Sequence, residues 1–196
     1  MNFYLNEILE KVLEKLDELQ SDFQENKGII LTEHDLQCLL FHKLYDLFTH
    51  DKETDDIEIK GSPLHCEIPF FDEERKLRLR PDIAIIDPKG YSIIHSIEDR
   101  YKETPSKEFS FYGDAIVIEL KFCRAKRGIT KIEGFENDFE KIKKIKGMNS
   151  NNRIYGIVAI FNKTDKRSKI FDEFRQEAAK FEPDIKVRYY TGNIKI

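Results

Sequence analysis

The sequence predicts an α/β protein in which a central β-sheet is covered by helices on both faces. Apolar residues recur at helical spacing near the N-terminus, whereas several later segments are short apolar runs typical of buried strands. One of these runs, 114–122, is followed by a helical pattern and then by a second buried run, 153–161. A strand that crosses through a helix to another buried strand is expected to lie parallel to it.

Two helices are expected to open the chain. Within 3–20, apolar residues repeat at steps of three and four, which is typical of an amphipathic helix. The polar stretch 21–28 should end this helix. Thr32, with Asp35 three residues later, then predicts an N-cap and a variant capping box for a second helix that continues to about Phe48.

Strands are expected to fill the middle of the chain. The segments 64–71 and 80–87 both read as strands. A DPKG turn leads from 80–87 into an apolar run at 91–98, so these two segments are expected to form a hairpin. Residues 99–113 are polar and aromatic, and a loop of this length often carries function.

The last third of the chain is expected to alternate helices and strands. Phenylalanines and isoleucines at helical spacing precede Gly147, which suits a helix C-cap. The remaining elements are expected to be a strand at 153–161, a helix at 165–181 and a strand at 185–190.

Composition and cysteine usage limit the class of protein. With 196 residues, 40% hydrophobic and 36% charged, the chain is expected to form one folded, soluble domain. No apolar run approaches the roughly 18 residues that span a bilayer, and the start of the chain is acidic and amphipathic rather than a signal peptide. The three scattered cysteines, Cys38, Cys66 and Cys123, favour a reducing compartment, so a cytoplasmic protein is expected.

Charge is distributed unevenly along the chain. The net charge is −4, yet residues 1–60 contain 15 acidic and 6 basic residues, so the rest of the chain is net positive. The segment 119–146 contains nine basic and five acidic residues. Such asymmetry can attract a polyanion to one surface of an acidic protein, so nucleic acid is compatible as a partner.

The strand 114–122 carries charges that a buried strand would not ordinarily hold. Because side chains alternate along a strand, Glu119 and Lys121 share one face. Burial of an unpaired charge is costly, so partners are expected. If Asp82, which follows Pro81 in an earlier strand, lies near Glu119, two carboxylates and an ammonium converge. Mg²⁺ is held in this way, with few protein oxygens and water completing its shell.

The stretches RPDIAIID and AIVIELKF together resemble the signature of the PD-(D/E)xK nuclease superfamily, in which Pro-Asp on one strand precedes acid-x-Lys on the next. The order of elements over about residues 32–161 is similar as well. The resemblance implies a restriction-endonuclease-like core with a central mixed sheet. Around that core, 1–30 would be an N-terminal helical extension, and 162–196 would add a C-terminal helix and strand.

The resemblance also implies a site and an activity. Asp82 and Glu119 would be metal ligands, with the Leu120 carbonyl as a third ligand. Lys121 would orient or activate the attacking water, and Glu33 would match a helix acid that assists the metal. The implied reaction is hydrolysis of phosphodiester bonds with Mg²⁺, or Mn²⁺ in its place, by a DNA endonuclease of defence, restriction or repair. Cutting both strands needs two sites, which suggests a homodimer.

Basic residues near the motif strand are candidates for contacts with the phosphate backbone. They are Arg124, Lys126, Arg127, Lys131, Lys141 and Lys144. A solvated helix face is the competing interpretation for the lysines.

Several alternatives remain at this point. The gap between Asp82 and Glu119 is long for the family, so the insertion 91–113 either forms a substrate-binding flap or indicates a different strand pairing. The charges could form structural ion pairs in a catalytically inactive binding or interaction domain. His34, Cys38 and His42 follow one another at four-residue steps, but a zinc site lacks an evident fourth ligand. The chain contains no GxxxxGK phosphate loop, which argues against an NTPase.

Overall fold

The structure is a computed structural model. It describes residues 4–26, 28–56, 58–71, 78–92, 110–111, 113–124, 133–147, 153–165 and 169–194. None of the helices within these ranges is long and apolar enough to cross a membrane.

A mixed sheet of five strands lies at the centre of the fold, in the spatial order β11-β10-β9-β6-β3. In chain order its strands are β3 (Leu64–Cys66), β6 (Ile83–Ile86), β9 (Ala115–Cys123), β10 (Ile154–Thr164) and β11 (Ile185–Ile194). The strands β9, β10 and β11 are parallel, whereas β6 runs antiparallel to both β9 and β3. The parallel pair expected from the strand–helix–strand pattern is therefore confirmed.

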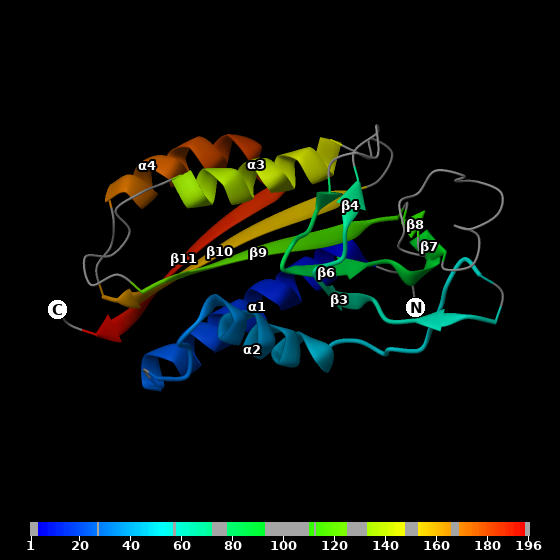
Figure 1. Ribbon diagram of the computed structural model, residues 1–196, viewed down its shortest axis with the longest axis horizontal. Coiled ribbons are helices and arrows are strands. Elements are labelled where there is room, and N and C mark those ends of the chain that lie inside the picture. The colour runs from blue at the N-terminus through cyan, green and yellow to red at the C-terminus, as the bar shows by residue number, and fades with distance from the viewer. Residues whose placement is uncertain are drawn as a thin grey trace.

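Helices cover both faces of this sheet (Figure 1). The helices are α1 (Leu5–Glu25), α2 (Glu33–Tyr45), α3 (Glu133–Gly147) and α4 (Lys169–Ala178). α1 and α2 pack on one face, and α3 and α4 on the other, so two separate apolar cores form. The predicted α/β fold with a mixed sheet and helices on both faces is confirmed at this level.

The two N-terminal helices form for the reasons that the sequence indicates. The apolar stripe of α1 is buried, and it extends beyond the predicted end because Phe23 continues the stripe at the spacing set by Leu16 and Leu19. α2 begins with a capping box, in which the Thr32 hydroxyl accepts from the Asp35 N–H and the Asp35 carboxylate accepts from the Thr32 N–H. Its last helical residue is Tyr45, slightly earlier than expected.

The alternation of faces along β9 is as predicted. Ile116, Ile118 and Leu120 belong to the core under α1 and α2, whereas Ala115 and Val117 belong to the core under α3 and α4. Glu119 and Lys121 therefore face α3 and α4. The two charged side chains of β9 therefore lie opposite α3, the next helix in the chain.

The expected hairpin between 80–87 and 91–98 is wrong. β6 pairs with β3 on one edge from Ile83 to Ile85 and with β9 on the other from Ile83 to Ile86, and the Ile86 N–H donates to the Pro63 carbonyl, so neither edge is free for a hairpin partner. Instead, β7 (Tyr91–Ser92) pairs with β8 (Ser110–Phe111). Residues 93–109, most of the insertion, lie outside the described residues.

The strand expected at 64–71 is divided in two. β3 ends at Cys66, and Glu67 has a φ of 51°, which an extended strand does not adopt. The chain resumes as β4 (Phe70–Phe71), which pairs with β5 (Arg78–Leu79). The polar loop before β3 contains a further antiparallel pair, β1 (Lys52–Glu53) with β2 (Lys60–Gly61).

One close approach fixes the height of α3 above the sheet. Gly156 of β10 lies directly beneath Ile142 of α3, and a Cβ atom at Gly156 would collide with Ile142 Cγ2. Ile142 is itself fully buried. Because Gly156 has no side chain, α3 can pack directly against the backbone of β10 at this position.

Candidate functional site

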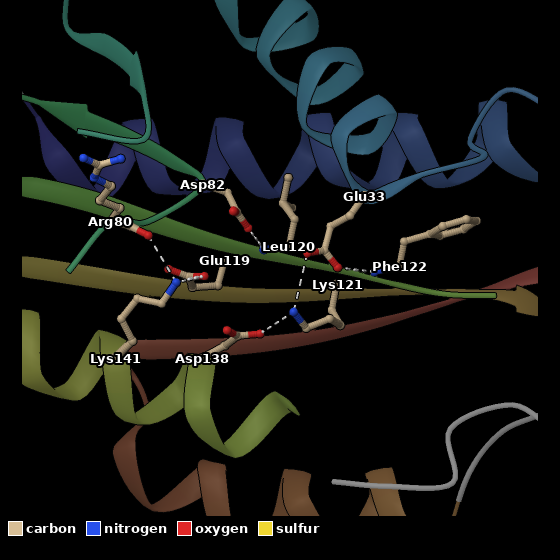
Figure 2. Close-up of polar contacts among 9 residues, drawn as sticks. All are labelled: Glu33, Arg80, Asp82, Glu119, Leu120, Lys121, Phe122, Asp138 and Lys141. Atoms are coloured by element: carbon tan, nitrogen blue, oxygen red, sulfur yellow. Dashed lines mark hydrogen bonds and ion pairs between the residues drawn. The ribbon is translucent and has the colours of Figure 1, made fainter. Parts of the chain in front are cut away.

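The site forms where β9 continues beyond the end of β6. The two strands pair from Ile86↔Ala115 to Ile83↔Ile118, and past Ile118 the one strand paired with β9 among the described residues is β10. On the edge that faces β6, two N–H groups of β9 bond to carboxylates. The Leu120 N–H donates to Asp82 Oδ2 at 2.6 Å, and the Phe122 N–H donates to Glu33 Oε2 at 3.2 Å (Figure 2).

This register settles the pairing that the long insertion left open. Because Ile83 pairs with Ile118, Asp82 lies next to Glu119 in the adjoining strands. The predicted neighbourhood of the two acids is therefore found in the structure, although 36 residues separate Asp82 from Glu119 in the chain.

The backbone of Asp82 is held by two further elements. Its carbonyl accepts a hydrogen bond from the Gln37 amide of α2 at 2.7 Å and another from the Glu67 N–H at 3.2 Å. Burial raises the pKa of the Asp82 carboxyl, and the bond from the Leu120 N–H opposes that rise. The left-handed Glu67 that interrupts the predicted strand is thus part of the support for Asp82.

Glu119 is the most buried carboxylate of the site. It is 2% exposed, and its Oε2 atom accepts from the Lys141 ammonium at 2.6 Å. The same ammonium donates to the Arg80 carbonyl at 3.1 Å. Glu119 Oε1 is buried without a hydrogen-bond partner among the described residues. Burial, with the nearby Asp82 carboxylate adding to it, raises the pKa of Glu119 to about 8.

Lys121 has different partners from those of Glu119, although both point to the same face. Its ammonium lies 3.2 Å from Asp138 Oδ2 on α3 and 3.5 Å from Glu33 Oε1 on α2. Burial alone would lower the pKa of Lys121, but Asp138 and Glu33 outweigh this effect and raise it. Burial likewise raises the pKa of Asp138, against the opposing effect of Lys121. Lys121 is therefore held in its charged form.

Four carboxylates and two ammonium groups thus meet around one end of β9. Glu33 comes from the start of α2, Asp82 from the residue before β6, Glu119 and Lys121 from β9, and Asp138 and Lys141 from α3 (Figure 2). Glu33, Asp82, Glu119 and Lys121, which the family resemblance predicts to form one site, all lie in this cluster.

The roles of three other residues were missed. Asp138 lies three residues after Phe135 and four before Ile142, so helical spacing could have placed it on the buried face of α3. Gln37 is likewise buried on the inner face of α2. Lys141 was expected at the surface as a phosphate contact, whereas the structure directs its ammonium to Glu119.

The other basic residues fall into two groups. Arg124, after the end of β9, and Lys144, on α3, are exposed. Lys126, Arg127 and Lys131 lie outside the described residues. Nucleic-acid binding by these five residues stays a prediction.

The donor atoms limit how a cation could be held. Within the described residues, no group of three or more His, Cys, Asp or Glu side chains is arranged to hold a metal ion, and this includes His34, Cys38 and His42. A site here would therefore rely on two carboxylates, Asp82 and Glu119, with a backbone oxygen and water. The Leu120 carbonyl lies on the same edge of β9 as its N–H, toward Asp82. Glu119 Oε1, which has no hydrogen-bond partner in the part of the chain that the structure describes, is a further oxygen of the hard type that Mg²⁺ takes.

A search of protein-family models, curated proteins and solved structures finds no match to this chain.

Proposed function

We propose that the protein is a Mg²⁺-dependent nuclease with a restriction-endonuclease-like core, and that it hydrolyses phosphodiester bonds of DNA in defence, restriction or repair. The observation that carries the proposal is the meeting of Asp82, Glu119 and Lys121 where β9 continues beyond the end of β6, together with a buried Glu119 Oε1 that has no hydrogen-bond partner among the described residues. This is the acid, acid and lysine set of the PD-(D/E)xK signature that RPDIAIID and AIVIELKF resemble.

Each residue has a role that follows from its position. Asp82 and Glu119 would hold Mg²⁺, with the Leu120 carbonyl beside them. When bound, the metal polarises the scissile phosphate and lowers the pKa of a bound water. Lys121 orients the attacking water and adds positive charge near the developing pentacoordinate phosphate. Glu33 and Asp138 fix the Lys121 ammonium from opposite sides.

A second candidate is a catalytically inactive domain on the same fold that binds nucleic acid or protein. It is favoured by the ion pairs themselves, because Lys141 already contacts Glu119 and Lys121 already contacts Asp138. In this alternative the cluster is purely structural.

Cleavage assays separate the two candidates. Plasmid, single-stranded DNA and RNA would be incubated with the protein in Mg²⁺, in Mn²⁺ and in EDTA. We expect metal-dependent cleavage that Asp82→Asn and Glu119→Gln each reduce by about 100-fold or more. Glu140→Gln is the matched control, since Glu140 is an exposed residue of α3 that pairs with Lys143. Absence of any metal-dependent cleavage would favour the inactive domain, and full activity of both site variants would show that this cluster is not the catalytic site.

A further inference from the structure

Lys141 lies in a position that resembles a cation site. Its ammonium contacts two oxygen atoms from different segments, Glu119 Oε2 at 2.6 Å and the Arg80 carbonyl at 3.1 Å. Carboxylate and backbone carbonyl oxygens are also the ligands that hard divalent cations take. The Arg80 guanidinium points away from this contact, so Lys141 is the positive charge at Glu119 Oε2 (Figure 2).

The two oxygens of Glu119 are in different situations. Oε2 is occupied by Lys141, whereas Oε1 is buried and has no partner among the described residues. A carboxylate that is 2% exposed and half satisfied is an unfavourable arrangement unless a proton or a cation completes it, and a divalent cation can displace the proton. Glu119 can thus serve one metal ion through Oε1 while Lys141 stays at Oε2.

The two lysines already occupy cation positions in the cluster. Lys121 lies between Glu33 and Asp138, and Lys141 lies between Glu119 Oε2 and the Arg80 carbonyl. A second divalent cation would have to displace one of these ammonium groups or lie against it, and repulsion between like charges in a half-buried site opposes a position beside them.

We propose that the Lys141 ammonium takes the place of a second divalent cation, so that the site binds one metal ion and Lys141 remains within it. This inference rests on the proposed metal-dependent function and specifies its stoichiometry. It assigns Lys141 as a positioning residue, which holds one oxygen of Glu119 and leaves the other for the metal.

The test is an Mn²⁺ titration of the full chain, followed by electron paramagnetic resonance of the free ion and by calorimetry. We expect the wild-type protein to bind a single Mn²⁺ ion. Lys141→Met frees Glu119 Oε2 and the Arg80 carbonyl, so a second, weaker Mn²⁺ should bind. Lys141→Arg keeps the charge and should retain single-ion binding. Lys144→Met is the matched control, one turn further along α3 and exposed, and its stoichiometry should equal that of the wild type.

Each outcome decides the proposal. Two ions in the wild type would overturn the role of Lys141 and leave the proposed function intact. A single, tighter ion in Lys141→Met would also overturn it, because Lys141 would then compete with the metal rather than replace a second one. No bound Mn²⁺ in the wild type would overturn this inference and the proposed function together. If circular dichroism shows that Lys141→Met does not fold, Lys141→Ala, which also frees Glu119 Oε2 and the Arg80 carbonyl, takes its place.

Discussion

The two halves of β9 belong to one continuous strand but have different neighbours. From Ala115 to Ile118 the strand is paired with β6 on one edge and β10 on the other, and all four residues are fully buried and apolar. Beyond Ile118 the β6 edge is bonded by the carboxylates of Asp82 and Glu33 instead. A buried strand can thus carry charged residues where carboxylates accept its backbone N–H groups in place of a neighbouring strand. The facing helix must also supply side chains of opposite charge.

The largest effect is expected from moving a carboxylate into the first half. Val117 faces the same side as Glu119 but is fully buried among apolar residues. Val117→Glu should destabilise the protein by about 3–5 kcal/mol, because the described residues of that core are apolar and none of them can pair with the charge. Glu119→Leu in the second half should cost much less, since Lys141 is partly exposed and can turn to solvent. Urea unfolding compares the two, and similar losses would contradict the distinction between the halves.

The next largest effect is a pH dependence confined to the second half. The pKa of Glu119 is raised to about 8 in the folded protein from an ordinary value of 4.5. The folded state therefore holds this proton over a pH range in which the unfolded chain has lost it. The contribution of Glu119 to the free energy of unfolding should be fully present below about pH 4.5 and should be lost as the pH rises through about 8.

Urea unfolding at pH 5.5 and pH 8.5 measures this dependence. Glu119→Gln should flatten it, whereas the control Glu140→Gln should leave it unchanged. Mg²⁺ should restore stability at the higher pH if the ionised site binds it. An unchanged slope in Glu119→Gln would assign the pH dependence to other groups.

A smaller effect is expected from removing the carboxylates that bond the edge of β9. Asp82→Ala leaves the Leu120 N–H without its charged acceptor and should cost about 1.5–3 kcal/mol. Glu33→Ala removes the acceptor of the Phe122 N–H, but Glu33 is 44% exposed, so its loss should cost less than about 1 kcal/mol. Equal losses in chemical denaturation would show that burial does not distinguish the two contacts.

A similarly small effect on stability is expected at Gln37, which bonds the Asp82 carbonyl. Gln37→Leu should cost about 0.5–1.5 kcal/mol, because the Glu67 N–H still donates to that carbonyl. It should weaken Mn²⁺ binding about 10-fold if Asp82 is a ligand. Gln20→Leu is the matched control, since Gln20 bonds the Thr191 carbonyl far from the site and should change stability without changing Mn²⁺ affinity. Equal Mn²⁺ affinity in the two variants would deny Gln37 a positioning role.

The sequence predicted those features that follow from the spacing of apolar residues and from the order of helices and strands along the chain. Helical spacing identified α1 and α2, alternation assigned Glu119 and Lys121 to one face, and the strand–helix–strand order gave the parallel pair β9 and β10. The neighbourhood of Asp82 and Glu119 followed from the resemblance, and the register Ile83↔Ile118 agrees with it.

Tertiary pairing produced the features that the sequence did not predict. Competition for the edges of β6 decides that it pairs with β3 and β9 rather than with the segment after the DPKG turn. The partners Asp138 and Lys141 depend on how far α3 is shifted along the sheet, which helical spacing does not specify. The break at Glu67 depends on its bond to the Asp82 carbonyl, a contact between segments distant in the chain.

The geometry of the site depends on Gly156, an uncharged residue of the neighbouring strand β10. It is paired with Val117, in the apolar half of the comparison, and it lets Ile142 rest on the sheet. Ile142 is the residue after Lys141 in the chain. A side chain at position 156 would push α3 away from the sheet. This shift would move Lys141 and Asp138 of α3 away from Glu119 and Lys121 of β9. The distances between the charged groups of the cluster thus depend on how closely α3 packs against the sheet at Gly156.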